Sequence, residues 1–142
     1  MTGEHTIILS LGSNTDAEKN MSRARVLMQS VLPDVVFTED MSTEPVGIEG
    51  PWFLNSLCKA HTTATPDEVV RMAKNIEAQL GDTAEQRDRG RVVMDVDLLL
   101  YDDLRLHDAD WQRPYVRLLM NRLPCEGKEE VMIGSYDWEL RS

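Results

Sequence analysis

The sequence predicts an α+β fold, a ferredoxin-like βαββαβ sandwich in which an antiparallel sheet carries both helices on one face. The first observation is order, because apolar runs and helical apolar repeats alternate as strand, helix, strand, strand, helix, strand. The second is that each helical repeat has a single apolar stripe. The third is that the last strand has one apolar face to meet those stripes. We therefore expect long loops over the other sheet face and a short irregular C-terminal extension.

Length, charge and apolar content restrict the class of protein. The 142 residues are enough for one domain with its own core, so we expect a single domain over residues 1–142. A formal net charge of −10 argues against a nucleic-acid surface, which needs concentrated lysine and arginine. No apolar run is long enough to span a membrane, and the chain does not open with a secretory signal. We expect a cytoplasmic protein, monomeric or weakly homo-oligomeric, that does not bind a membrane.

The first strand and the first helix are predicted near the start of the chain. Residues 6–11 form a nearly continuous apolar run that suits a central strand, and the glycine, serine and asparagine at positions 12–14 break it. Thr15 and Glu18 have the spacing of a capping box, and apolar residues then recur at helical spacing until Pro33. The turn between the two elements can be a phosphate-binding loop or a plain connection, and the motif alone does not distinguish them.

Two more strands and a shaped loop follow the first helix. Residues 35–38 predict a second strand with a ragged, exposed end, and residues 44–51 hold two prolines and two glycines that exclude regular structure. Residues 52–60 predict a third strand, on which Phe53 and Asn55 share one face. An aromatic ring and an amide in this arrangement can stack on and hydrogen-bond a flat heterocycle. The amide can equally be an ordinary satisfied polar group.

The second helix has the clearest end signals in the chain. Thr65 is a predicted N-cap, Pro66 stands at the first helical position, Glu68 completes a capping box, and Gly81 closes the C-terminal end. Glu77 lies near the end of this helix and can simply be solvated.

Two aspartates interrupt the most apolar stretch of the sequence, residues 92–101. A strand period of two places Asp95 and Asp97 on one face, although aspartate is depleted in strands. Two carboxylates at this spacing can converge on one hard cation or on two, and oxygen ligands favour Mg²⁺ or Mn²⁺. An acid–base pair or a structural turn is also compatible with the spacing. The opposite face is predicted to be wholly apolar, with Val92, Met94, Val96, Leu98 and Leu100.

Three arginines alternate just ahead of the acidic stretch, at Arg87, Arg89 and Arg91. They belong to a polar loop over residues 82–90 that we expect to connect the second helix to the last strand. They can neutralise the two aspartates, or they can clamp phosphates whose metal ions the aspartates hold.

The C-terminal third of the chain has weaker signals. Residues 102–103 predict a turn, residues 104–107 a short edge strand, and residues 114–123 a short helix. Residues 130–136 could form another strand.

Five groups of residues together resemble the 6-hydroxymethyl-7,8-dihydropterin pyrophosphokinases of folate biosynthesis. They fall in the family's order and at its spacing, and together they are more specific than any one of them. The groups are Leu11-Gly12-Ser13-Asn14, Ser42-Thr43-Glu44-Pro45-Val46-Gly47, Phe53-Leu54-Asn55, Glu77, and Asp95-Val96-Asp97-Leu98-Leu99-Leu100-Tyr101.

The resemblance implies a ferredoxin-like fold and a Mg²⁺-dependent transfer of pyrophosphate from ATP to the hydroxymethyl group of the pterin, with release of AMP. Asp95 and Asp97 match aspartates that hold two Mg²⁺ ions in the family. The positions that match the pterin site are Thr43, Pro45, Val46, Phe53 and Asn55. For ATP the resemblance points to Glu77, and the chain offers Arg87, Arg89 and Arg91 in place of the family's basic phosphate contacts. We assign catalysis to Asp95, Asp97 and Arg91.

The chain also departs from the family pattern at several places, including the absence of an aromatic residue shortly after Arg122 and a short, dissimilar C-terminal part. Gly90-Arg91-Val92 lacks the proline that the family usually has before the first aspartate, Asp82 stands where the family places basic residues, and Tyr115 replaces a histidine after Pro114. Two other functions therefore stay open. One is a family member that binds a pterin or a nucleotide without efficient transfer, and the other is a ferredoxin-like regulatory domain that binds only a metal.

Overall fold

The computed structural model describes residues 3–45 and 49–123. Within these residues, no helix combines the length and the apolar character that crossing a membrane requires. In chain order the elements are β1 (His5–Ser13), α1 (Ala17–Val31), β2 (Val36–Phe37), β3 (Met41–Thr43), β4 (Phe53–Thr62), α2 (Pro66–Gln79), α3 (Ala84–Asp88), β5 (Asp95–Tyr101), β6 (Leu104–Arg105), α4 (Asp108–Trp111) and α5 (Pro114–Met120).

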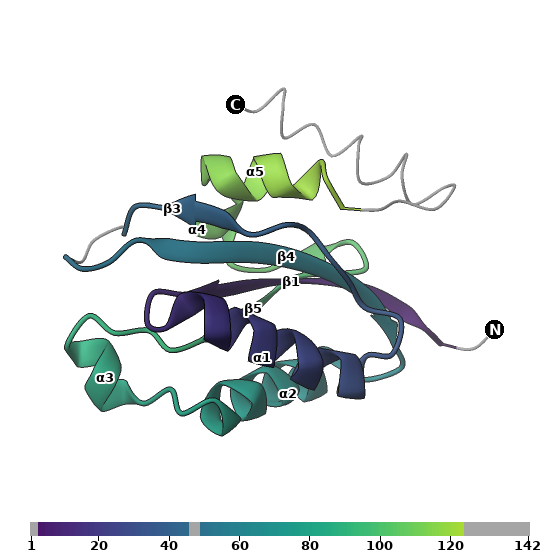
Figure 1. Ribbon diagram of the computed structural model, residues 1–142. Helices are drawn as coiled ribbons and strands as arrows, with labels where there is room; N and C mark the ends of the chain where they lie inside the picture. Colours follow the sequence, from purple (N-terminus) through teal and green to yellow (C-terminus); the bar gives the residue numbers. More distant parts are fainter. Residues whose placement is uncertain (1–2, 46–48, 124–142) are drawn as a thin grey trace.

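One antiparallel sheet organises the described part of the chain. Its strand order is β2-β4-β1-β5-β6, and β3 also pairs with β4. The two long helices α1 and α2 lie on the same face of this sheet (Figure 1). This arrangement confirms the predicted ferredoxin-like fold, in which the two strands before and after each long helix are separated in the sheet by another strand.

The main core fills the space between the sheet and the two long helices. Apolar side chains of β1, β4 and β5 meet the apolar stripes of α1 and α2 there, as each amphipathic repeat requires. The side chains with less than 2% exposure in this layer include Ile7, Leu9, Leu11, Met21, Met28 and Met94.

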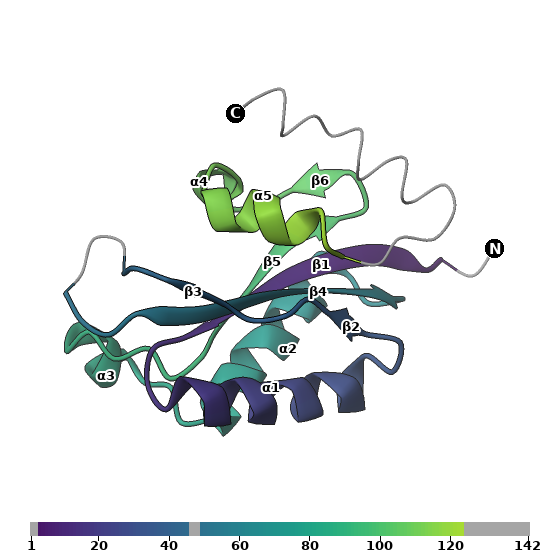
Figure 2. The same ribbon diagram turned by 45° about the horizontal axis from the view of Figure 1, so that its top comes forward.

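A second apolar layer covers part of the opposite sheet face. The expectation that only loops cover this face was wrong, because α4 and α5 lie over it (Figure 2). Trp111 of α4 and Val116 and Leu119 of α5 are buried against Ile8 and Leu57 of the sheet. The short helices therefore form a third layer of the fold.

The second helix begins and ends as predicted. Thr65 Oγ1 accepts a hydrogen bond from the Glu68 backbone N–H at 3.2 Å, and the Thr65 N–H donates to Glu68 Oε1 at 2.8 Å. Beyond the helix, Gly81 has a φ of +93°, the left-handed conformation that favours glycine after a helix. The residues that predicted the two ends of α2 all lie within a few positions of those ends.

The first helix begins differently from the prediction. β1 continues through Ser13, and the N-cap is Asp16, whose side chain makes no capping hydrogen bond. The Thr15 hydroxyl donates instead to Asn14 Oδ1 at 3.0 Å. The predicted capping box was wrong because the N-cap is one residue later than Thr15, which places Glu18 at the second helical position rather than at the third.

The acidic strand is shorter than predicted and contains a β-bulge. It begins at Asp95 rather than at residue 92. In the pairing with β1, Leu98 lies opposite Leu9 and Leu100 opposite Ile8, which leaves Leu99 as an extra residue on β5. The bulge reverses the alternation of side chains, so Leu100 packs in the second layer rather than beside Leu98. The prediction of one apolar face from residue 92 to residue 100 was therefore wrong beyond Leu98, and it was also wrong at Val92, because Val93 is the residue buried in the core there.

The remaining elements are short. The predicted second strand is split into β2 and β3, which pair with different parts of β4. The predicted loop over residues 82–90 contains α3, and α4 was not predicted. The helix expected from residue 114 is confirmed as α5, whereas the strand expected at residues 130–136 and the C-terminal extension lie outside the described residues.

Candidate active site

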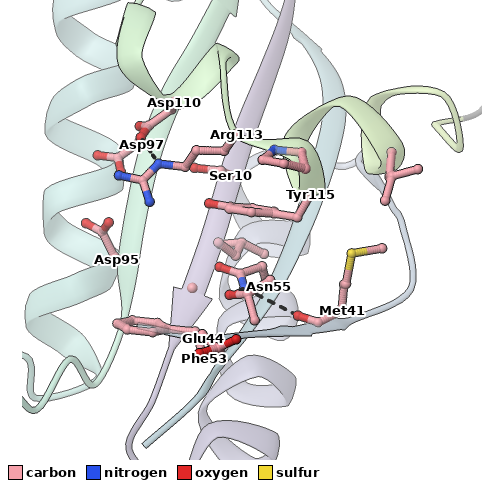
Figure 3. Close-up of a pocket in the computed structure, with 15 residues that line it drawn as sticks. Ser10, Met41, Glu44, Phe53, Asn55, Asp95, Asp97, Asp110, Arg113 and Tyr115 are labelled. Carbon is pink, nitrogen blue, oxygen red and sulfur yellow. Dashed lines mark hydrogen bonds and ion pairs between the residues drawn. The ribbon is translucent and has the colours of Figure 1, made fainter. Parts of the chain in front are cut away.

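A cavity of about 660 Å³ lies on the sheet face opposite α1 and α2 (Figure 3). The central strands β1, β4 and β5 supply its floor, and β3 and the α4–α5 segment supply further lining residues. The cavity is lined by Ser10, Leu11, Gly12, Met41, Thr43, Glu44, Phe53, Asn55, Asp95, Asp97, Asp110, Arg113, Pro114, Tyr115 and Leu118.

The strand register aligns four of these residues in one row across the sheet. Asp95 lies opposite Gly12, Gly12 lies opposite Asn55, and Asn55 lies opposite Met41. Gly12 has no side chain, so the space above it stays open between the Asp95 carboxylate and the Asn55 amide. Asp97 lies opposite Ser10, one step further along the same face.

Asn55 is held in a fixed orientation with its oxygen available. Its Nδ2 donates to Thr43 Oγ1 at 2.6 Å and to the Met41 carbonyl at 3.3 Å. Within residues 3–45 and 49–123, no group donates a hydrogen bond to Asn55 Oδ1, and this residue is 6% exposed. The oxygen can therefore accept a hydrogen bond from an N–H group of a bound molecule.

Two aromatic rings face the same cavity from different elements. Phe53 enters from β4, and Tyr115 enters from the first turn of α5 (Figure 3). Burial, followed by the negative charge of Asp110, raises the pKa of Tyr115 to about 12, so this phenol is neutral at physiological pH. Flat apolar rings beside a fixed amide favour a planar heterocyclic ligand.

The carboxylates gather at the other end of the cavity. Burial, and then the neighbouring charges of Asp95, Asp110 and Glu77, raise the pKa of Asp97 to about 7. The His107 Nε2 atom lies 3.9 Å from Asp97 Oδ1. Oxygen ligands at this negative end make Asp95 and Asp97 the side chains that could hold a hard cation.

Side chains outside the cavity fix where the acidic strand begins. Asn14 Oδ1 accepts from the Val92 N–H at 2.7 Å, and Asn14 Nδ2 donates to the Gly90 carbonyl at 2.9 Å. Asp82 Oδ1 accepts from the backbone N–H groups of Val93 and Met94. These bonds favour a structural role for the turn at residues 12–14 over a phosphate-binding loop.

Glu77 and Arg87 lie behind the acidic strand rather than in the cavity. The Glu77 Oε2 atom accepts from the Val96 N–H at 2.8 Å, which satisfies a backbone donor in the part of β5 that β6 does not pair with. Arg87 donates from Nε to Asp82 Oδ2 at 2.6 Å and from Nη2 to the Met94 carbonyl at 3.0 Å. Its Nη2 also lies 3.4 Å from Asp95 Oδ1.

Comparison with known proteins identifies the family. Residues 8–124 match the family described as 7,8-dihydro-6-hydroxymethylpterin-pyrophosphokinase (HPPK). The chain belongs to this family. The predicted resemblance is thereby confirmed over most of the sequence, and the family is one of pyrophosphokinases, which are diphosphotransferases.

Individual relatives agree with the family match. A 2-amino-4-hydroxy-6-hydroxymethyldihydropteridine pyrophosphokinase of Porphyromonas gingivalis is 31% identical over 128 residues, which cover 79% of this chain and 86% of that protein. A protein of the same name from Methylorubrum extorquens is 33% identical over 111 residues, which cover 75% of this chain and 70% of that protein. A folate synthesis bifunctional protein of Arabidopsis thaliana is 28% identical over 142 residues, covering 92% of this chain and 29% of that protein.

Within this HPPK chain, the structure places the predicted residues in three groups. The cavity is lined by five of them, namely Thr43, Phe53, Asn55, Asp95 and Asp97. Pro45, Glu77, Arg87, Arg89 and Arg91 do not line it. Val46 lies outside the described residues.

Sequence reasoning missed the contribution of the α4–α5 segment to this HPPK site. Asp110, Arg113 and Leu118 were not proposed as site residues, and Tyr115 was noted only as a departure from the family. The available signal was the pairing of opposite charges three residues apart, at Asp110 and Arg113, directly before a proline. The helices are too short for apolar periodicity to show which side chains face the sheet.

Proposed function

We propose that this chain transfers pyrophosphate from ATP to the hydroxymethyl group of 6-hydroxymethyl-7,8-dihydropterin, with AMP as the second product. The observation that carries the proposal is a single cavity with two chemically different ends. One end offers aromatic rings and a fixed amide, which suit a flat heterocycle, and the other offers paired carboxylates, which suit the cations of a polyphosphate. The pyrophosphokinase family supports the reaction class.

The aromatic end is the proposed pterin site. Phe53 stacks on the ring, and Asn55 Oδ1 accepts a hydrogen bond from a ring N–H. Thr43 holds the Asn55 amide in that orientation through the 2.6 Å hydrogen bond. Pro45 and Val46, in the loop that follows β3, remain predictions for the same site.

The carboxylate end is the proposed site of two Mg²⁺ ions, with Asp95 and Asp97 as ligands. The donor set fits, because a divalent cation compensates the negative charges that raise the pKa of Asp97. In the described part of the chain, no three His, Cys, Asp or Glu side chains are grouped to hold a metal alone, so water and phosphate oxygens would complete the coordination. When bound, the ions neutralise phosphate charge and align the displacement.

The chain's own contribution to the reaction is positioning. Asn55, Gly12 and Asp95 lie in one row of the sheet, so a heterocycle bound by Asn55 can extend a substituent over Gly12 toward the carboxylates. Hydrogen-bonded strands hold all three residues, which limits the freedom of the bound reactants. This geometry supports a transfer between groups bound at the two ends.

The remaining assignments stay predictions. These are ATP binding by Glu77, Arg87, Arg89 and Arg91, and a catalytic contribution of Arg91. Of these three arginines, Arg87 contacts Asp95, whereas Arg91 is exposed. We further propose that residues 1–142 act as one domain in the cytoplasm, as a monomer or a weak homo-oligomer.

A second candidate function is the binding of a pterin or a nucleotide without efficient transfer of pyrophosphate. The observation that favours it is the position of Arg87, which contacts Asp82 and a backbone carbonyl and does not line the cavity. An arginine bound in this way is less available for a phosphate than a free one.

A direct assay separates the two candidates. The protein is mixed with ATP, Mg²⁺ and 6-hydroxymethyl-7,8-dihydropterin, and AMP release is followed. We expect AMP in proportion to pterin consumed, and a loss of at least about 100-fold in Asp95→Ala and in Asp97→Ala with folding retained, since positioned charges contribute this order of rate. Asp103→Ala, in an exposed turn, is the control. Pterin binding without AMP above background would instead establish the second candidate.

A further inference from the structure

Arg113 is the basic side chain of a cavity that is otherwise acidic. Of the described residues that line the cavity, Arg113 alone is a lysine, arginine or histidine, and four others are acidic: Glu44, Asp95, Asp97 and Asp110. Arg113 precedes Pro114 as the N-cap residue of α5, at the junction with α4. A polyphosphate that enters this cavity therefore meets one guanidinium group there.

One contact orients the Arg113 side chain and leaves most of its donors available. Arg113 Nε donates to Asp110 Oδ1 at 3.1 Å. The guanidinium has five N–H groups, so the four on the terminal nitrogens remain, and no acceptor among the described residues binds them. Figure 3 shows this end of the side chain directed toward the part of the cavity that holds Asp95 and Asp97.

The arginines of the α3 loop are placed differently. Arg87 is bound to Asp82 and to the Met94 carbonyl. Arg89 is exposed, and its Nη2 atom lies 3.7 Å from Glu85 Oε2. Arg91 is exposed as well. Because none of the three lines the cavity, a phosphate inside the cavity would not contact them in this conformation.

We propose that Arg113 binds a phosphate group of the nucleotide and that Asp110 orients its guanidinium for this contact. The inference rests on the proposed function, because it requires a polyphosphate in the cavity. Its physical basis is the planar fork of the guanidinium, which matches two phosphate oxygens when Nε is held by another acceptor. Arg113 is then a binding residue, and Asp110 is a positioning residue.

Calorimetric titration with Mg²⁺ and inorganic tripolyphosphate tests Arg113 without requiring turnover. We expect Arg113→Met to bind tripolyphosphate roughly 10- to 100-fold more weakly than the wild type, the usual range for charge-assisted hydrogen bonds. Arg113→Lys keeps the charge but not the fork, so it should recover only part of the affinity. Pterin binding should be unchanged in both variants.

Arg117→Met is the matched control. It removes the same charge from the same helix, but Arg117 contacts Gln112 at 3.4 Å and does not line the cavity. We expect wild-type affinity for tripolyphosphate. Thermal unfolding of all variants checks that each is folded.

The role of Asp110 is tested by a double-mutant cycle. Asp110→Ala should weaken tripolyphosphate binding by less than Arg113→Met does, and the double variant should bind no more weakly than Arg113→Met. A stronger affinity in Asp110→Ala, or fully additive losses, would overturn the positioning role.

Equal affinity of Arg113→Met and Arg117→Met for tripolyphosphate would overturn the phosphate contact, and so would a wild-type protein that binds no tripolyphosphate. Failure of the proposed function has a different signature. Tripolyphosphate would then bind through Arg113, while ATP, Mg²⁺ and the pterin together would release no AMP.

Discussion

Gly12 shows how the absence of a side chain shapes the site. A Cβ at this position would lie 3.2 Å from Asn55 Oδ1 and 3.8 Å from the Phe53 ring. Its φ is not positive, so the backbone would accept another residue, and the requirement is for space alone. The open floor over Gly12 is what connects the amide end of the cavity to its carboxylates.

Asp97 is the residue at which the site and the stability of the fold conflict. Its pKa is raised to about 7, first by burial and then by the charge of Asp95. A raised pKa means that the folded state binds this proton more tightly than the unfolded state does. The contribution of the protonated Asp97 carboxyl to the free energy of unfolding is therefore fully present below about pH 4. It is lost as the pH rises toward 7.

We predict that Asp97→Asn stabilises the metal-free protein at high pH. At pH 8.5 with a chelator, urea unfolding should give a free energy of unfolding about 2–4 kcal/mol above the wild-type value, since each unit of pKa shift corresponds to about 1.4 kcal/mol. At pH 4 the difference should largely disappear, because the wild-type carboxyl is then protonated in the folded state. Equal stability of the two proteins at pH 8.5 would show that burial and the neighbouring charges do not raise the pKa of Asp97.

At the scale of elements, the entry into β5 decides where the acidic pair lies. Asn14 bonds the Val92 N–H and the Gly90 carbonyl, so its amide joins the end of β1 to the chain that leads into β5. Asp95 follows three residues after Val92. Loss of this amide should therefore affect both the stability and the placement of the site.

We predict that Asn14→Ala lowers the free energy of unfolding by about 1–3 kcal/mol, because it leaves two backbone groups without partners. It should also lower kcat/KM for AMP release more than the stability loss alone explains. The matched control is Asn20→Ala, which removes another buried amide, bound to the Thr15 carbonyl at 2.7 Å on α1. A similar stability loss with unchanged kcat/KM is expected there. Equal kcat/KM losses in both variants would contradict a specific role of Asn14.

The elements also show which features the sequence can predict. The ends of α2 were predicted because Thr65, Glu68 and Gly81 act within a few residues of the helix. The start of α1 follows Asn14, whose amide is bound to Val92 and Gly90 far along the chain, and the bulge at Leu99 depends on pairing with β1, so periodicity could not predict either feature.

The same distinction holds for the site. A strand period of two and the family resemblance predicted the face shared by Asp95 and Asp97 and that of Phe53 and Asn55, and all four line the cavity. Arg113, by contrast, reaches the cavity because α4 and α5 fold back over the sheet, and the local charge pair of Asp110 and Arg113 does not show this long-range packing.

At the scale of the whole molecule, the two apolar layers have different tasks. The layer between the sheet and α1 and α2 holds the fold together on the side away from the site. The layer beneath α5 also fixes the cavity wall, because Val116 and Leu119 pack on the sheet while Tyr115 and Leu118 face the cavity. Stability should therefore depend on both layers, and ligand affinity mainly on the second.

We predict that Leu119→Ala and Met28→Ala separate these tasks. Both side chains have 0% exposure, so each truncation should lower the free energy of unfolding by about 2–5 kcal/mol. Only Leu119→Ala should also weaken pterin binding, by about tenfold or 1.4 kcal/mol, because α5 carries the Tyr115 wall and loses its anchor on Ile8 and Leu57. Urea unfolding and calorimetric titration with the pterin give the two quantities. If both variants bind the pterin as weakly as each other, or as tightly as the wild type, then α5 does not control the site and the cavity depends on the sheet alone.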